Sequence, residues 1–145
     1  FHRLMACHPA EDESPLRVVA GLVFWQERLL ISRRPPGKTL AGFWEFPGGK
    51  VASGESDEQA LRRELMEEVA IEVGPLRPFG SVRHRYSFRE VDLHFFAAPW
   101  LRGEAVPIEC DAVAWIHCAQ LQEYTFPPAD EQILQRLTQE AHWWR

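Results

Sequence analysis

The stretch from Gly49 to Ile71 constrains this chain more than any other part of its sequence. It begins at a predicted turn, Pro47-Gly48-Gly49, where the backbone can approach a ligand closely. A helix is predicted next, because Ser56 and Gln59 have the spacing of a capping box. At 100° per residue this helix places apolar side chains on one arc and carboxylates on the adjacent arc, namely Leu61, Leu65 and Val69, then Glu64, Glu67 and Glu68.

The clustered carboxylates predict a divalent cation. Glu64 and Glu68 are like charges one helical turn apart, which costs about 0.2–0.5 kcal/mol unless a positive charge lies nearby. Hard cations with oxygen ligands suit such a site, and Mg²⁺ usually brings a polyphosphate with it. A helix rich in Glu and Arg is more often a solvated surface. A solvated surface, however, does not explain the fixed spacing to Gly49 and Glu55.

The overall composition is typical of a globular protein. The chain has 145 residues, 46% hydrophobic and 26% charged, so we expect a single domain over residues 15–145. Residues 1–14 are polar, and we expect a flexible segment there. Residues 1–4 are either a cloning remnant before Met5 or part of the native chain. The net charge of −5 argues against nucleic-acid polymers and membrane surfaces as main partners.

Cysteine usage and hydropathy predict a cytoplasmic protein. Cys7, Cys110 and Cys118 form no CxxC pair and no even disulfide framework, which suits a reducing compartment. No apolar run approaches the ~18 residues of a membrane helix, and there is no signal-peptide pattern.

Hydrophobic periodicity predicts a mixed fold. Strands are expected at 16–25 and 28–33, as a hairpin around Gln26-Glu27, and then at 43–46, 80–86, 91–98 and 112–117. A last helix is expected from Pro127-Pro128, with an apolar stripe of Ile133, Leu134, Leu137 and Ala141. This order of elements predicts an α/β (α+β) fold, an α/β/α sandwich with a mixed sheet between helices.

The stretch from Gly49 to Ile71 resembles the signature of the Nudix hydrolase family, G-x5-E-x7-R-E-U-x-E-E-x-G-U, where U is a bulky aliphatic residue. The matching positions are Gly49, Glu55, Arg63, Glu64, Leu65, Glu67, Glu68 and Ile71. Ala70 stands where the signature has glycine. Glycine there suits a helix end with positive φ, so Ala70 predicts a different helix exit or mild strain.

The resemblance implies a loop–helix–loop that holds Mg²⁺, with Mn²⁺ as a substitute. The implied metal site comprises Gly48, Glu64, Glu67, Glu68 and Glu109, and the implied catalytic residues are Glu64, Glu55 and Arg63. Arg63 would orient the glutamates, and Glu55 would support the loop or approach a metal through water. Glu64 is the implied general base, with Glu55 and Glu109 as alternatives.

Two further runs, Trp44 to Lys50 and Phe126 to Glu131, are similar to the bacterial MutT-type branch of the family. Its best-known members hydrolyse 8-oxo-dGTP to the monophosphate and pyrophosphate. The similarity covers roughly residues 17–138. It implies a substrate side that comprises Arg34, Phe46, Gly49, Lys50, Arg89 and Asp130.

Asp130 leaves the choice of base open. The best-known 8-oxo-dGTP enzyme carries asparagine at this position, whose amide both donates and accepts, whereas an ionised aspartate only accepts. A protonated Asp130 would restore the donor, which requires burial to raise its pKa. An ionised Asp130 also fits the N4 amine of cytosine.

The resemblance therefore implies a Mg²⁺-dependent nucleoside triphosphate diphosphatase that releases the monophosphate and pyrophosphate. The leading substrate is 8-oxo-dGTP, whose removal prevents mutation. CTP, dCTP and other nucleoside diphosphate-linked compounds are the alternatives. A non-enzymatic alternative is an oxidised-base binding module, although Nudix-like domains of that kind usually lose the metal glutamates that this chain keeps. We expect a monomer or weak homodimer.

Overall fold

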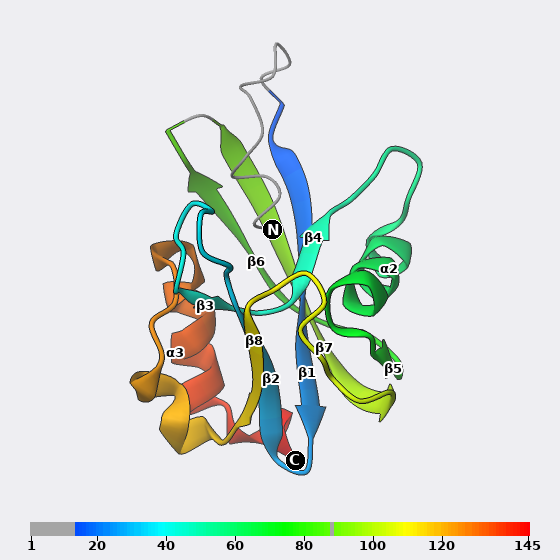
Figure 1. The fold of residues 1–145 in the computed structure, drawn as a ribbon, viewed down its shortest axis with the longest axis vertical. Helices are drawn as coiled ribbons and strands as arrows, with labels where there is room; N and C mark the ends of the chain where they lie inside the picture. Colours follow the sequence, from blue (N-terminus) through cyan, green and yellow to red (C-terminus); the bar gives the residue numbers. More distant parts are fainter. Residues whose placement is uncertain (1–13, 88) are drawn as a thin grey trace.

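The computed structural model describes residues 14–87 and 89–145 as a mixed β-sheet with a helix against each face (Figure 1). The strands are β1 (Leu16–Trp25), β2 (Arg28–Arg33), β3 (Trp44–Glu45), β4 (Gly48–Lys50), β5 (Glu72–Val73), β6 (Arg77–Arg85), β7 (Glu90–Arg102) and β8 (Ala112–Ile116). The α-helices are α2 (Asp57–Val69) and α3 (Glu131–Gln139), and short 3-10 helices span Cys118–Glu123, Pro128–Asp130 and Ala141–Trp144. Apart from Ser14, the flexible segment expected at residues 1–14 lies outside the described residues.

β1 is central because both of its faces are apolar. Val18, Leu22 and Phe24 belong to the core cluster that includes Ile133 and Leu137 of α3. Val19 and Val23 belong to the cluster that includes the apolar stripe of α2 (Leu61, Leu65 and Val69). The sheet thus has two apolar faces, each covered by one helix, and the predicted α/β/α sandwich is confirmed (Figure 1).

β1 is parallel to β7 and antiparallel to its other partners. The β1–β7 register runs from Leu16↔Val91 to Phe24↔Pro99. The hairpin with β2 is confirmed, but the two strands pair only at Phe24↔Leu29 and Trp25↔Arg28. Because β2 diverges from β1 beyond this point, the first half of β1 is left with an edge for another strand.

That edge is taken by β4, where the sequence predicted only a turn. Val18, Val19 and Ala20 of β1 pair with Lys50, Gly49 and Gly48. A Cβ atom on Gly48 would lie 2.0 Å from the carbonyl oxygen of Val19, so only glycine allows this approach. The predicted turn is therefore wrong, because a long-range backbone contact decides the conformation of these glycines.

The remaining elements follow the prediction with shifted ends. β6 and β7 extend beyond the expected ranges, and the short strand β5 was not predicted. The last helix begins with a 3-10 turn at Pro128–Asp130, and α3 ends at Gln139, before Ala141. Its stripe is confirmed at Ile133 and Leu137, which are buried. No helix in the described ranges has both the length and the apolarity to cross a membrane.

Candidate active site

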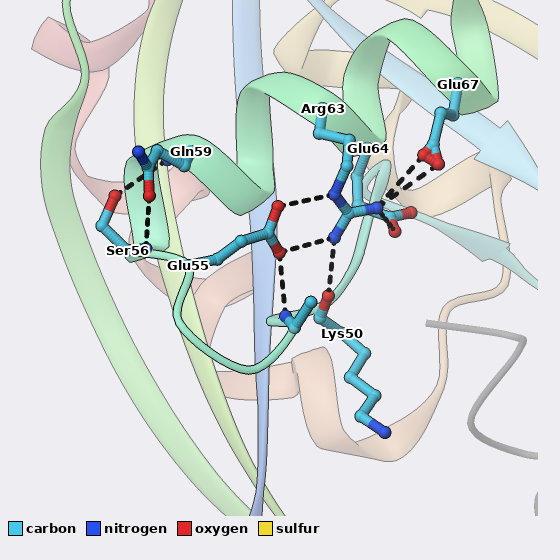
Figure 2. Close-up of polar contacts among 8 residues, drawn as sticks. Lys50, Glu55, Ser56, Gln59, Arg63, Glu64 and Glu67 are labelled. Atoms are coloured by element: carbon cyan, nitrogen blue, oxygen red, sulfur yellow. Dashed lines mark hydrogen bonds and ion pairs between the residues drawn. The ribbon is translucent and has the colours of Figure 1, made fainter.

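Arg63 is the hub of a polar cluster on α2 (Figure 2). Its Nε and Nη2 donate to the two carboxylate oxygens of Glu55 at 2.7 and 2.8 Å. Its Nη1 donates to Glu64 Oε1 at 2.6 Å and to Glu67 Oε2 at 3.1 Å. Its Nη2 also donates to the carbonyl of Lys50 at 3.1 Å. One guanidinium therefore fixes the positions of three carboxylates and of the β4 backbone.

Glu55 closes the loop that leads into α2. Its Oε1 accepts from the backbone N–H of Ala52 at 2.8 Å while its carboxylate receives the Arg63 fork. These hydrogen bonds, first of all that from Arg63, lower the pKa of Glu55 to about 2. A carboxylate with so low a pKa is a poor proton acceptor at neutral pH, so the geometry favours a supporting role for Glu55.

The start of α2 follows directly from the sequence. Ser56 Oγ accepts from the N–H of Gln59 at 3.1 Å, and Gln59 Oε1 accepts from the N–H of Ser56 at 2.9 Å (Figure 2). This is the predicted capping box, and it fixes the first turn one residue after Glu55. The spacing from Glu55 to Arg63 then places both side chains on the same side of the helix start.

Glu64 and Glu68 point inward, toward β4. A Cβ atom on Gly49 would lie 2.4 Å from the carboxyl carbon of Glu64. Glu68 Oε2 accepts from the N–H of Gly48 at 3.2 Å, and Glu68 Oε1 accepts from Ser32 Oγ at 3.4 Å. Burial raises the pKa of Glu68 to about 7, and the negative charge of Glu45 adds to the effect. The absence of a side chain on Gly49 thus leaves room for the Glu64 carboxylate, and the backbone N–H of Gly48 binds that of Glu68.

This donor set fits a divalent cation. Among the described residues no three His, Cys, Asp or Glu side chains converge closely enough to share a metal ion. Glu64, Glu67 and Glu68 nevertheless lie on one helix with a single guanidinium between two of them, and burial disfavours the charge on Glu68. Carboxylate oxygens with too little positive charge around them suit Mg²⁺ or a similar hard cation.

The backbone of Glu109 contacts the end of α2. The N–H groups of Ile108 and Glu109 donate to the carbonyl of Glu68 at 3.1 and 3.2 Å, and the N–H of Val106 donates to the carbonyl of Val69 at 3.1 Å. The loop before β8 therefore covers the carbonyls at the end of α2, which would otherwise lack partners. This brings the backbone of Glu109 to the helix that carries Glu64, Glu67 and Glu68.

Ala70 ends α2 in the left-handed conformation, with φ 62° and ψ 36°. Its N–H donates to the carbonyl of Met66 at 3.1 Å. The helix exit is thus the one that a glycine would give, so the expectation of a different exit is wrong. The alternative expectation, mild strain, is confirmed because alanine is disfavoured at positive φ.

A second group of polar residues lies inside the protein, between β3 and the start of α3. Arg34 is fully buried and its Nη1 lies 3.3 Å from Glu45 Oε2. Asp130 is 8% exposed. Its pKa is raised to about 8, first by burial and then by the negative charge of Glu45. A cavity of about 10 Å³ joins Asp130, Glu45 and Phe46, and the rest of its lining is apolar (Val18, Ala20, Leu93 and Phe95).

Glu45 is the residue of this pocket that the sequence analysis missed. It is 3% exposed and it contacts Arg34 from the neighbouring strand. The available signal was its place in the run from Trp44 to Lys50, between two aromatic residues. The identity of its partner depends on the β2–β3 pairing at Ser32↔Glu45, which local pattern does not reveal.

The predicted substrate residues Arg34, Arg89 and Lys50 lie in three different environments. Arg34 is buried rather than exposed. Arg89 Nε donates to the carbonyl of Ser14 at 2.9 Å, so its guanidinium holds the chain before β1. Lys50 is exposed and its side chain points away from the Arg63 cluster (Figure 2). The structure thus brings Phe46 and Asp130 together and does not join Arg89 and Lys50 to them.

The sequence profile of the NUDIX domain matches residues 19–136. The chain belongs to the Nudix family. It is 35% identical to the CTP pyrophosphohydrolase of Escherichia coli over 83% of this chain and 89% of the relative. It is 40% identical to the 8-oxo-dGTP diphosphatase of Proteus vulgaris over 64% of this chain and 84% of the relative.

Comparison with solved structures supports the same family, because Nudix hydrolases share the fold of this chain. The MutT Nudix hydrolase of Burkholderia pseudomallei superposes with a TM-score of 0.76 at 26% identity, over 87% of this chain and 100% of that one. This Nudix hydrolase is therefore of the MutT type and is an enzyme, as the glutamates of the family signature predicted. Enzymes of the family generally use a divalent metal ion, which agrees with the chemistry of the carboxylates on α2.

Proposed function

We propose that this Nudix hydrolase is a Mg²⁺-dependent pyrophosphohydrolase that converts a nucleoside triphosphate to the monophosphate and pyrophosphate, with 8-oxo-dGTP as its main substrate. The observation that carries the proposal is the Arg63 hub, which holds Glu55, Glu64 and Glu67 around β4 beside the buried Glu68. Four carboxylates with a single guanidinium among them are costly to assemble unless a metal cation adds further positive charge. A bound Mg²⁺ in turn suits a substrate with a phosphate anhydride.

The carboxylates of Glu64, Glu67 and Glu68 are assigned to the metal, with Gly48 and Glu109 completing the set. A bound Mg²⁺ would neutralise charge on the polyphosphate and lower the pKa of a water molecule. Arg63 acts as a positioning residue, because its Nη1 contacts both Glu64 and Glu67. Glu55 fixes Arg63 in turn.

Glu64 is assigned as the general base. Glu55 is a weaker proton acceptor because its hydrogen bonds, above all that from Arg63, lower its pKa to about 2. Glu109 is the remaining candidate for the general base. Turnover by the Glu64→Gln and Glu109→Gln variants distinguishes the two residues. Water then attacks the β-phosphorus, and the bond from this phosphorus to the oxygen that bridges it to the α-phosphorus breaks. The nucleoside monophosphate leaves with that bridging oxygen, and pyrophosphate keeps the oxygen of water.

The region of Phe46, Glu45 and Asp130 is assigned to the base. Its cavity of about 10 Å³ has room for no more than a water molecule, so its walls would have to move apart to admit the base. Because burial and Glu45 raise the pKa of Asp130 to about 8, its carboxyl group is largely protonated at neutral pH. A neutral carboxyl group both donates and accepts, as an asparagine amide does. It therefore suits 8-oxoguanine, which donates from N7–H and accepts at O6. Phe46 stacks on Phe126 at a centroid distance of 5.2 Å, so this contact fixes the orientation of the Phe46 ring beside Asp130.

CTP is a second candidate for a specific reason. A relative at 35% identity over most of both chains is a CTP pyrophosphohydrolase. A neutral Asp130 also matches cytosine, since it can accept from the N4 amine and donate to N3. The polar group at position 130 therefore does not by itself choose between the two bases.

A steady-state comparison of 8-oxo-dGTP, dGTP, CTP, dCTP and ADP-ribose with Mg²⁺ tests the proposal. We expect 8-oxo-dGTP to lead dGTP in kcat/KM by about tenfold or more, since only the oxidised base donates from N7. A tenfold lead of CTP or dCTP would make the cytidine assignment correct instead. Failure to release pyrophosphate from every triphosphate would reject the whole class of reaction.

A further inference from the structure

A second and larger cavity lies at the other end of β1. It has a volume of about 580 Å³, and its walls include Trp25, Trp100, Trp143, Trp144 and Arg77. In Figure 1 this is the end of the sheet where the β1–β2 turn and the C-terminus lie. Trp25 is five residues beyond Ala20, the last β1 residue that pairs with β4, which is roughly 16 Å along a strand. The cavity shares no lining residue with the Asp130 pocket or with the Arg63 cluster.

Hydrogen bonds hold the indole rings of this cavity in place. Trp100 Nε1 donates to the carbonyl of Gly103 at 2.8 Å, Trp143 Nε1 donates to Glu140 Oε1 at 2.8 Å, and Trp144 Nε1 donates to the carbonyl of Leu137 at 2.9 Å. The polar edges of these three rings are thus satisfied by the protein. What the rings offer to a ligand is apolar surface in a fixed orientation, which suits the stacking of a flat molecule.

Arg77 supplies positive charge beside these rings. Its guanidinium lies 4.8 Å from the centre of the Trp143 ring. Within residues 14–87 and 89–145 it has no hydrogen-bond or ion-pair partner, unlike Arg17, Arg33, Arg62 and Arg136, which each contact a carboxylate. Arg145 also lines the cavity, as does the acidic residue Glu27. A protein with a net charge of −5 therefore places two guanidinium groups at one aromatic cavity.

The turn at the mouth of the cavity has an unusual composition. Gln26 and Glu27 both have positive φ, at 51° and 60°. Two-residue hairpin turns of this kind usually contain Asn and Gly, which tolerate positive φ better. Gln26 and Glu27 instead carry long polar side chains, and both residues line the cavity. They supply acceptors that suit the hydroxyl groups of a sugar.

We propose that this cavity is a second ligand site that binds a nucleoside monophosphate. The base would stack between the indoles, and the phosphate would lie toward Arg77 and Arg145, because guanidinium groups match phosphate oxygens in geometry and charge. The volume of about 580 Å³ falls in the range of small-molecule sites. The argument uses only the residues of this cavity and does not depend on the proposed reaction.

The signals of the six indole N–H groups in ¹H–¹⁵N spectra test this site directly. CMP and dGMP are added separately to the protein in EDTA, so that no metal supports binding at the glutamates of α2. Trp→Phe variants assign the signals. We expect saturable shifts of the Trp100 and Trp143 signals with little change at Trp44, which lies in β3. Inorganic phosphate and the free nucleoside are expected to bind more weakly than the nucleotide.

The Arg77→Ala variant tests the contribution of Arg77 to nucleotide binding, and Arg85→Ala is its matched control. Both arginines are exposed and lie on β6, but only Arg77 lines the cavity. We expect Arg77→Ala to weaken nucleotide binding about fivefold or more, and Arg85→Ala to leave it unchanged. Equal weakening by both variants, shifts confined to Trp44, or no saturable shift at millimolar nucleotide would overturn the proposal. So would signals of Trp25 and Trp100 that broaden with protein concentration alone, since a second copy of the chain would then occupy the cavity.

Discussion

Gly49 lies so close to Glu64 that a methyl group on Gly49 would fall 2.4 Å from the Glu64 carboxyl carbon. The strand beside the helix therefore fixes where this carboxylate can be. Gly48, the neighbouring residue, meets backbone instead, because its Cβ would lie 2.0 Å from the carbonyl oxygen of Val19. The absence of a Cβ on Gly49 thus serves the position of Glu64, and the absence of a Cβ on Gly48 serves the pairing of β4 with β1.

Gly49→Ala and Gly48→Ala should consequently have different effects. Gly49→Ala displaces the Glu64 carboxylate, so we expect kcat to fall by about 10²-fold with a small change in stability. Gly48→Ala forces β4 away from β1, so we expect a loss of about 2–4 kcal/mol in the free energy of unfolding. Urea denaturation and steady-state kinetics on both variants measure the two effects. Similar losses of stability in both variants would contradict this division.

The Arg63–Glu55 pair should make stability depend on pH in acid. The pKa of Glu55 is lowered from 4.5 to about 2, chiefly by Arg63. A lowered native pKa adds stability above pH 4.5 that is lost as the pH falls toward 2. We expect Glu55→Gln to flatten the curve of Tm against pH in this window and to reduce turnover.

Glu140→Gln is the matched control for that variant. Arg136 and Trp143 lower the pKa of Glu140, also to about 2, at a place remote in sequence from the Nudix signature. We expect it to reproduce the change in the acid part of the Tm curve and to leave turnover unchanged. A loss of turnover in Glu140→Gln would show that the activity assay reports stability rather than the site.

Ala70→Gly should stabilise the enzyme. Ala70 has φ 62°, where glycine carries no Cβ penalty. We expect the free energy of unfolding to rise by about 1 kcal/mol and Tm by about 2–4 °C, with unchanged kcat/KM. Ala60→Gly, a buried position near the start of the same helix, is expected to lower stability by about 1 kcal/mol. Thermal melts that move in the same direction for both variants would rule out strain at Ala70.

Asp130→Asn should remove a pH dependence on the alkaline side. The pKa of Asp130 is raised from 3.8 to about 8, first by burial. The native protein then holds a proton that the unfolded chain has lost, so stability falls as the pH rises from about 4 to about 8. We expect Asp130→Asn to be more stable than the parent at pH 8 by a few kcal/mol, and by little at pH 4. A difference that does not change with pH would contradict a protonated Asp130.

The local elements were predictable because their signals are local. The capping box of Ser56 and Gln59, the stripe of Leu61, Leu65 and Val69, and the β1–β2 hairpin each depend on residues that are near in sequence. The position of Gly48–Lys50 was not predictable in the same way. Two glycines after a proline predict a turn, and only the edge left free on β1 makes them a strand.

The site was predictable where the family signature covers it. The contacts of Arg63 with Glu55 and Glu64 follow from fixed spacing on one loop and helix. The burial of Arg34 beside Glu45 depends on the pairing of β2 with β3, and the raised pKa of Asp130 depends on that same interior. These features come from tertiary packing, which a single sequence does not display.

Pyrophosphate release by Glu64→Gln in Mg²⁺ tests the central claim most directly. The comparison uses Glu109→Gln, which removes the other candidate base, and Glu58→Gln, an exposed position on the same helix that pairs with Arg62. We expect Glu64→Gln to lower kcat by about 10²–10⁴-fold while Tm changes little, and Glu58→Gln to match the parent. Turnover by Glu64→Gln equal to that of the parent enzyme would contradict the mechanism.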